Sequence, residues 1–213
     1  MNREIIVALD AMGVIYQPGA DVDELVIPFV RERGCTKADA EIVALYNDAS
    51  LGLLSTRELW TRLDVAGDPE HLDRGIAARY TVTDGLHDFL RWCGDAGLPV
   101  ACISNDVSEW ATLRARHFRL SDAIASWTIS GDVGARKPDA AIYEAFLSAV
   151  SPHTTCVFVD DRPRNVAAAA SRGMHGVLFG PGAATFPQAM TVAADFAVLK
   201  GLIQEMRADS SAR

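Results

Sequence analysis

Residues 5–16 have the sequence IIVALDAMGVIY, and this stretch decides the fold class. Ile5 to Leu9 is a short, unbroken apolar run with the length and the Ile and Val content of a strand buried on both faces. Val100 to Ile103 and Cys156 to Val159 are two further runs of this kind, and Val177 to Phe179 is a weaker fourth. Helical patterns separate these runs, at Ser108 to His117, Ala140 to Val150 and Val166 to Arg172. The alternation predicts an α/β fold whose core is a doubly wound parallel sheet, of the Rossmann type.

The segment from Pro18 to Tyr80 has a different pattern. It contains no strand signal, and its apolar residues recur at helical spacing, as at Val22, Val26 and Phe29. We therefore predict a small all-helical cap domain at residues 18–80, inserted into an α/β core domain formed by residues 1–17 and 81–213. A chain of 213 residues can bury a substantial core and still carry such an insertion.

Composition limits the class of protein and its partners. Lys and Arg total 20 against 28 Asp and Glu, and the net charge of -8 disfavours nucleic acid and an anionic membrane surface as partners. The four cysteines are widely spaced with no CxxC pair, which favours reduced core thiols. The first apolar run is too short for a signal-peptide core, so we expect a cytoplasmic protein. The sequence does not predict an oligomeric state.

All three strong strand patterns end at polar residues. Asp10 follows the first run, Ser104 and Asn105 follow the second, and Asp160 and Asp161 follow the third. Ligands of open α/β sheets bind beyond the carboxyl ends of the strands, so these side chains are expected to converge on one crevice. Carboxylates gathered there would repel one another unless a cation joined them. Magnesium suits such an all-oxygen site, where it can bridge carboxylates to a substrate phosphate.

Each of these residues also has an ordinary structural interpretation. Asp161 precedes Pro163 and a helix, so it could be a helix cap, and Asp10 before Gly13 could be a turn residue. Ser104 and Asn105 could close a turn, and a single lysine such as Lys137 is most often a solvated surface residue. Only the joint arrangement favours chemistry.

Four motifs occur in order along the chain: ALDAMGVIY at 8–16, CISND at 102–106, RKPD at 136–139 and VFVDDRPRN at 157–165. In these motifs the sequence resembles the haloacid dehalogenase superfamily, over nearly the whole chain. The resemblance implies a magnesium-dependent hydrolase, most simply a phosphatase of a small phosphorylated metabolite, in which Asp10 is the nucleophile and becomes an aspartyl phosphate.

The resemblance also implies roles for the other motif residues. Ser104 and the amide of Asn105 would hydrogen-bond the transferring oxygens, and Lys137 would offset charge on the nucleophile and the phosphoryl group. Asp161, Asp10 and the backbone carbonyl of Met12 would hold magnesium. Asp160 would orient Lys137 or a metal-bound water, and Asn165 would support that loop.

Met12 departs from the phosphatase pattern of this superfamily. Phosphatases usually have a second aspartate there, which protonates the leaving oxygen and later activates water, a role commonly worth about 10² to 10⁴ in rate. Three interpretations stay open. The chain is a magnesium-dependent hydrolase whose substrate has a good leaving group or whose acid comes from the cap; or it resembles 2-haloacid dehalogenases, which displace halide from carbon without a metal; or it is a non-catalytic binding protein that keeps the fold.

Four polar or aromatic residues of the cap are weaker candidates for selecting substrate. Their more common role is to pack or to solvate a helix face. They are Tyr46, Arg57, Trp60 and Arg62.

Overall fold

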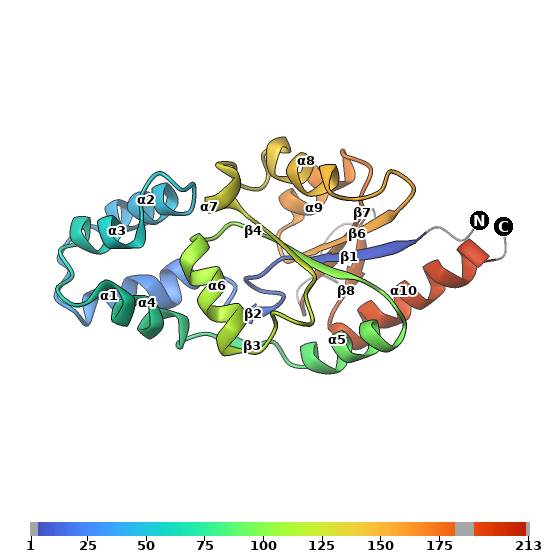
Figure 1. Cartoon of the computed structure of the whole chain (residues 1–213), viewed down its shortest axis with the longest axis horizontal. Coiled ribbons are helices and arrows are strands. Elements are labelled where there is room, and N and C mark those ends of the chain that lie inside the picture. Colours follow the sequence, from blue (N-terminus) through green and yellow to red (C-terminus); the bar gives the residue numbers. More distant parts are fainter. Residues whose placement is uncertain (1–3, 182–189, 212–213) are drawn as a thin grey trace.

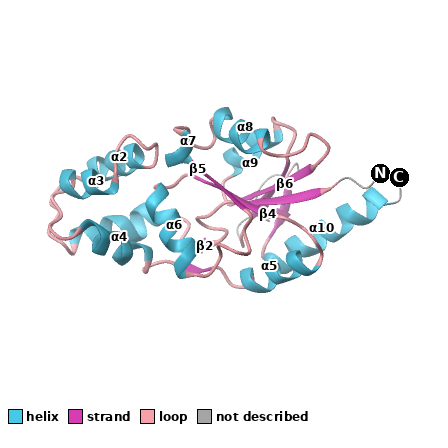
Figure 2. Cartoon of the chain, viewed as in Figure 1, coloured by secondary structure: helices cyan, strands magenta, loops and turns pink. Residues whose placement is uncertain are grey.

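The computed structural model describes residues 4–181 and 190–211. Its centre is a six-stranded sheet in which every neighbouring pair of strands is parallel (Figures 1 and 2). The strands, in spatial order, are β5 (Ser126–Ile129), β4 (Val100–Ser104), β1 (Ile5–Leu9), β6 (Thr155–Asp160), β7 (His175–Phe179) and β8 (Thr191–Ala193). This architecture confirms the predicted α/β class with a parallel sheet.

The strand order places the first motif at the centre of the sheet. The chain runs outward from β1 through β4 to β5, then returns to the other side of β1 and runs outward again through β6 to β8. The carboxyl end of β1 therefore lies between the carboxyl ends of β4 and β6, at the switch point where ligands bind in such sheets.

Helices cover both faces of the sheet. Successive strand residues point to opposite faces, and because these residues are apolar on both faces, each face must be buried. Leu9 and Val159 belong to one apolar cluster, whereas Ala8 and Phe158 belong to another. The first cluster includes residues of α5 (Leu86–Asp95), α6 (Ser108–His117) and α10 (Phe196–Ser211). The second includes residues of α8 (Ala140–Ser148) and α9 (Pro163–Ala170), and a one-turn helix, α7 (Ser130–Val133), follows β5.

Residues 18–80 contain no strand and form a cluster of short helices at one end of the molecule (Figure 1). These are η1 (Val22–Val26), α1 (Ile27–Arg31), α2 (Asp39–Ala49), α3 (Thr56–Arg62) and α4 (Pro69–Ala77). A capping box is present at the start of α3, where Ser55 Oγ accepts from the Glu58 backbone amide and the Glu58 carboxylate accepts from the Ser55 backbone amide.

The helical segment joins the core through a short ribbon and a shared apolar interior. The ribbon pairs β2 (Tyr16–Gln17) with β3 (Thr81–Val82) in antiparallel fashion. The buried carboxylate of Asp73 on α4 accepts hydrogen bonds from the indoles of Trp60 on α3 and Trp110 on α6, at 2.8 Å each. We propose that the ribbon marks the boundary between the core (1–17 and 81–213) and the cap (18–80).

Several boundaries differ from the sequence-based expectation. The pattern missed β5 and β8, because neither strand has an unbroken apolar run like those of the central strands. Both lie at the edges of the sheet. The last expected helix begins at Pro163 rather than Val166. Proline is favoured at the first position of a helix, where its missing N–H costs no hydrogen bond. Gly173 follows that helix with φ +82°, as expected for a residue that ends a helix.

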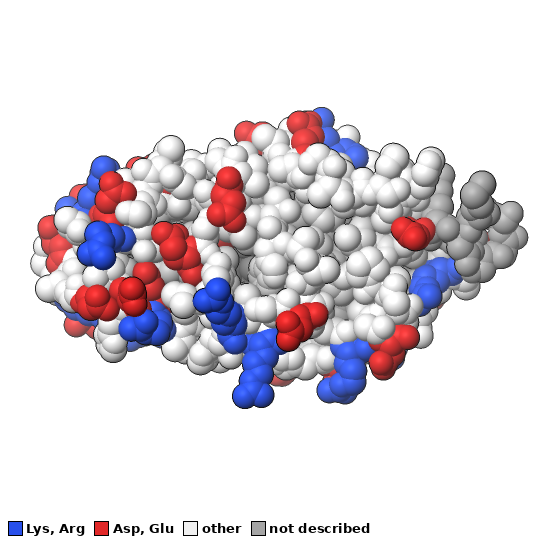
Figure 3. Space-filling view, viewed as in Figure 1, with Lys and Arg blue, Asp and Glu red and all other residues white. Residues whose placement is uncertain are grey.

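The structure shows where the charged side chains and the thiols lie, and the thiols are the reduced core residues that the sequence favoured. Basic and acidic side chains lie interspersed over the cap end on the face shown in Figure 3. All four cysteines are buried and free. Among the described residues, none of the helices has the length and apolar content needed to cross a bilayer.

Candidate active site

Lys137 connects two carboxylates at the carboxyl ends of adjacent strands. Its ammonium lies 2.6 Å from Asp10 Oδ1 and 2.8 Å from Asp160 Oδ2. All three side chains are buried, and Asp10 retains only 6% of its exposure. Asp10 follows β1 and Asp160 ends β6, so the sheet itself brings these residues together. The ordinary interpretation of Lys137 as a solvated lysine is wrong.

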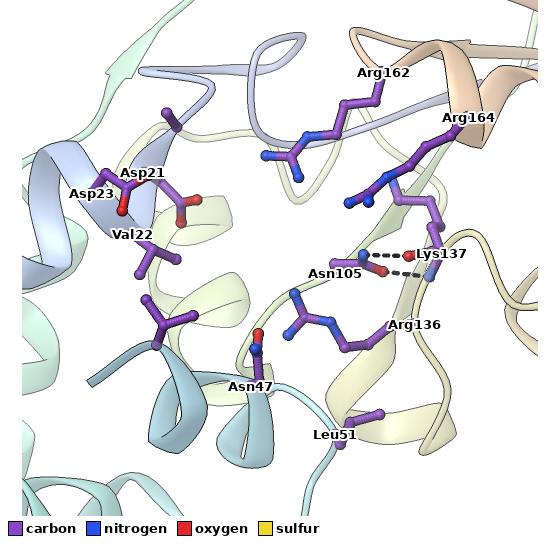
Figure 4. Close-up of a pocket in the computed structure, with 12 residues that line it drawn as sticks. Asp21, Val22, Asp23, Asn47, Leu51, Asn105, Arg136, Lys137, Arg162 and Arg164 are labelled. Atoms are coloured by element: carbon purple, nitrogen blue, oxygen red, sulfur yellow. Dashed lines mark hydrogen bonds between the residues drawn. The ribbon is translucent and has the colours of Figure 1, made fainter. Parts of the chain in front are cut away.

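The loop that carries Lys137 is fixed by Asn105 at the end of β4. The side-chain amide of Asn105 donates to the Lys137 carbonyl at 2.9 Å, and the backbone amide of Lys137 donates to Asn105 Oδ1 at 2.7 Å (Figure 4). The Lys137 ammonium also donates to the carbonyl of Ile103 at 2.7 Å. These bonds hold the lysine in one direction, towards Asp10.

Asp160 is held just as firmly. Asn165 Nδ2 lies 3.0 Å from both carboxylate oxygens, and the amide of Arg162 donates to Oδ1 at 2.8 Å. Asn165 lies in the first turn of α9, so the helix that follows β6 supports the carboxylate that ends it.

Asp161 is the third carboxylate of the cluster, and it has an unused oxygen. One oxygen each from Asp10, Asp160 and Asp161 lie within 4.8 Å of one another. Asp161 Oδ1 is buried and has no hydrogen-bond partner among the described residues; its nearest cation, Arg162 Nε, is 3.9 Å away. Asp161 does not cap α9, whose N-cap residue is Arg162.

Gly13 makes room for Asp161. The chain turns sharply after β1, and Gly13 adopts φ +81°, a conformation that glycine reaches without strain. A Cβ atom at this position would lie 2.5 Å from Asp161 Oδ2, and one at Gly19 would lie 3.0 Å from the same oxygen. The absence of a side chain at Gly13 and Gly19 therefore leaves room for Oδ2 of Asp161.

The electrostatics of the cluster are unbalanced, because three carboxylates face one ammonium. Burial, and then the charge of Asp160, raise the pKa of Asp10 well above its ordinary value, although Lys137 opposes this shift. Burial and Asp160 likewise raise the pKa of Asp161 to about 6. For Lys137, burial favours the neutral amine, but Asp10 and Asp160 outweigh it and raise the pKa. A cation beside these carboxylates would relieve their repulsion.

Ser104 and Met12 differ in their relation to the pocket above the carboxylates. Ser104 is buried at the end of β4, and its hydroxyl has no hydrogen-bond partner among the described residues. It does not line the pocket above the cluster. Met12 does line that pocket, at the position where phosphatases of the resembling superfamily usually have an aspartate.

The pocket above the cluster has an inner and an outer compartment. The inner one, of about 70 Å³, is bordered by Asp10, Met12 and Tyr46 among other residues, and the outer one, of about 530 Å³, opens between cap and core. The two compartments adjoin, because six residues line both: Asp21, Val22, Asn105, Arg136, Lys137 and Arg162.

The two walls of the outer compartment differ in charge. Arg136, Arg162 and Arg164 extend from the core wall, and Asp21 and Asp23 lie on the cap wall across from them (Figure 4). The cap helix α2 adds Asn47 to this lining, and Leu51 follows just beyond the end of the helix.

The sequence analysis found only part of this lining. Of its four cap candidates, Tyr46 lines the pocket and Trp60 is buried in the apolar interior. Arg57 and Arg62 are exposed and do not line the pocket. Asp21 was missed because no motif marks it. Arg136, Arg162 and Arg164 lie inside the motifs RKPD and VFVDDRPRN, so their proximity to Lys137 and Asp161 was the available signal.

Comparison with known proteins agrees with this geometry. The family described as haloacid dehalogenase-like hydrolase matches residues 6–173, most of the chain. The chain belongs to this family. It is therefore a haloacid dehalogenase-like hydrolase, as the four motifs predicted.

Among curated proteins, this hydrolase is similar to flavin mononucleotide hydrolase 1 of Arabidopsis thaliana, described as chloroplastic. The two are 31% identical over 134 residues, which cover 60% of this chain and 54% of the plant protein. The chain thus spans about half the length of that relative.

Solved structures share the fold at low identity. A HAD phosphatase from Thermococcus onnurineus superposes with a TM-score of 0.68 at 18% identity, covering 93% of this chain and 97% of the other. A HAD family enzyme of Bacteroides thetaiotaomicron, in complex with magnesium and inorganic phosphate, gives 0.66 at 15% identity, covering 80% and 91%. The L-2-haloacid dehalogenase of Xanthobacter autotrophicus, with chloropropionic acid covalently bound, gives 0.65 at 15% identity, covering 95% and 99%. The fold is thus common to phosphatases and dehalogenases.

Proposed function

We propose that this hydrolase is a magnesium-dependent phosphatase of a small phosphorylated metabolite, with Asp10 as the covalent nucleophile. The observation that carries the proposal is the free oxygen of Asp161, buried beside Asp10 and Asp160. A buried carboxylate oxygen without a hydrogen bond is costly unless it binds something, and a cation is its natural ligand.

The donor set fits magnesium. Asp10, Asp161 and the backbone carbonyl of Met12 would hold the ion, and all three offer the oxygen ligands that magnesium prefers. When bound, magnesium would neutralise charge on the carboxylates and on the phosphoryl oxygens. The Bacteroides enzyme of the same fold, with magnesium and phosphate, is consistent with this assignment.

The protein's own residues supply the rest of the chemistry. A carboxylate oxygen of Asp10 would attack phosphorus, and the bond from phosphorus to the leaving oxygen would break. Lys137, held by Asp160 and Asn105, would keep its ammonium beside the nucleophile and offset charge on the transferring group. The backbone amide of Asn105 would hydrogen-bond the phosphoryl oxygens. The Ser104 hydroxyl, which has no partner among the described residues and does not line the pocket, would join it after a side-chain rearrangement. Water would then release phosphate from Asp10.

The pocket favours an anionic substrate of modest size. The inner compartment suits a phosphoryl group, and the outer compartment has room for the remainder of a small metabolite. Arg164 lines the outer compartment and forms no hydrogen bond or ion pair with the described residues, so its guanidinium is available to a second anionic group.

The two alternatives explain less of the site. Metal-free displacement of halide gives no role to Asp161, whose charge would hinder a nucleophile in the absence of a cation. A non-catalytic binding protein would need neither the buried lysine nor the free carboxylate oxygen. Both alternatives remain measurable outcomes.

The experiment is a substrate panel with purified protein. We expect phosphate release from phosphate esters, loss of this activity on chelation with EDTA, recovery on adding magnesium, and no turnover by Asp10→Asn. Halide release from 2-haloacids without metal would establish the dehalogenase alternative. No turnover of either substrate class, together with binding of a metabolite, would establish the binding protein.

A further inference from the structure

We propose that Asp21 is the proton donor and acceptor that takes the place of the missing aspartate at Met12. This inference rests on the proposed phosphatase function and deepens it. Asp21 lies just before η1, where the chain enters the cap, yet it lines both compartments of the pocket. A group in the cap would thus complete the chemistry of the core.

The inner compartment offers no other carboxyl for this role. Asp10 and Asp21 are the two carboxyl groups among the described residues that line it, and Asp10 is the nucleophile, paired with Lys137. Met12 lies in the same lining and has no exchangeable proton. The cations there are Arg136, Lys137 and Arg162, none of which is an acid near neutral pH.

Two tyrosines hold the Asp21 carboxyl in place. The Tyr80 hydroxyl donates to Asp21 Oδ2 at 2.9 Å, and the Tyr46 hydroxyl lies 3.5 Å from the same oxygen. No described residue bonds Oδ1. One oxygen is therefore anchored and the other is free to exchange a proton with a substrate.

The surroundings raise the pKa of the Asp21 carboxyl towards neutrality. Burial and the nearby charge of Asp106 raise the pKa of Asp21 to about 6, while Arg114, the Tyr80 hydroxyl and Arg162 lower it. The side chain retains 5% of its exposure. Tyr46 and Arg136 also face this carboxyl. A general acid and base works best when its pKa lies near the working pH, so this environment suits both roles.

The proton balance of the two steps is complete. In the first step the Asp10 oxygen forms a bond to phosphorus, the bond to the leaving oxygen breaks, and that oxygen takes the Asp21 proton and leaves as an alcohol. In the second step water attacks phosphorus and gives a proton to the Asp21 carboxylate. The bond between phosphorus and Asp10 then breaks, which releases inorganic phosphate and restores both side chains.

The test is the dependence of rate on the leaving group. The constant kcat/KM reports the steps through phosphoryl transfer to Asp10, and protonation of the leaving group matters for an alkyl phosphate but little for p-nitrophenyl phosphate. Asp21→Asn keeps the shape and can still accept from Tyr80. We expect kcat/KM to fall about 10² to 10⁴ fold for glycerol phosphate and less than about tenfold for p-nitrophenyl phosphate. With p-nitrophenyl phosphate the variant should also accumulate phosphoenzyme, which intact mass would detect, because asparagine at this position cannot take a proton from the attacking water.

The ratio of the two kcat/KM values does not depend on the fraction of folded protein, so misfolding cannot imitate the effect. Glu24→Gln is the matched control: Glu24 is exposed on the same cap segment and lines neither compartment, and the ratio should stay within about threefold of wild type. An unchanged ratio in Asp21→Asn would overturn the role of Asp21 and leave the phosphatase intact. Absence of magnesium-dependent activity with both esters in the wild type would overturn the proposed function as well.

Discussion

Gly13 gives the sharpest test of the proposed metal site, because a single methyl group there would collide with one carboxylate. In Gly13→Ala the new Cβ would lie 2.5 Å from Asp161 Oδ2, about 1 Å inside ordinary van der Waals contact. Asp161 must therefore move by about that distance, and a shift of 1 Å in a catalytic group can cost about 10² fold in rate. The substitution also places alanine at φ +81°, a strain of roughly 1–2 kcal/mol.

Gly34→Ala separates the collision from the strain. Gly34 has φ +87°, but nothing lies within 4 Å of the point that a Cβ atom would occupy, so this variant carries a similar backbone strain far from the carboxylates. Both variants should lose roughly 2–8 °C in Tm for a chain of this size. Only Gly13→Ala should raise the magnesium concentration for half-maximal activity and lower kcat/KM about 10² fold. Equal magnesium dependence in the two variants would refute the placement of the metal at Asp161.

Three further outcomes follow from other parts of the structure. Arg114→Met should destabilise the protein by about 3–5 kcal/mol in urea unfolding, because it leaves Asp106 buried without its counter-ion, whereas loss of the exposed Arg91 pair should cost less than about 1 kcal/mol. Asp21→Asn should change how stability depends on pH. The raised pKa keeps the folded state protonated where the unfolded chain has released its proton, so the wild type should lose up to about 3 kcal/mol as pH rises from about 4 to about 6, and the variant should lack this loss. Arg164→Ala should raise KM about 10 to 100 fold for substrates with a second anionic group and leave kcat nearly unchanged, which steady-state kinetics would measure.

The central strands were predictable because each is an unbroken apolar run, buried on both faces. Ile5–Leu9 has the bounds expected from its pattern, and Asp10 and Asp160 come together because their strands are neighbours. The edge strands were not predictable in this way. Thr191–Ala193 is three residues long and owes its conformation to pairing with β7, a contact that its own sequence does not contain.

The same distinction applies to the site. Residues at strand ends were predictable because a parallel sheet collects them at one edge, and Lys137 followed from its motif. Asp21 was not predictable, since a lone aspartate near the start of a helix usually has a capping role. Here it makes no side-chain cap, and its environment comes from Tyr46 and Tyr80, which lie 25 and 59 residues further along the chain. Only the folded cap brings these groups together.

The division of labour between the two parts of the chain has a consequence for specificity. The core provides the proposed nucleophile Asp10, the buried lysine and the arginines, which would suit any phosphate ester. The cap provides Asp21, Asn47 and the remaining wall of the pocket. If proton transfer depends on a cap residue, a substrate must fit the cap before its leaving group can be protonated. Binding energy from the part of the substrate remote from phosphorus would then be expressed in the rate of phosphoryl transfer as well as in affinity. Because Met12 replaces the usual aspartate, the cap wall of the pocket would both recognise the substrate and supply the proton to its leaving group.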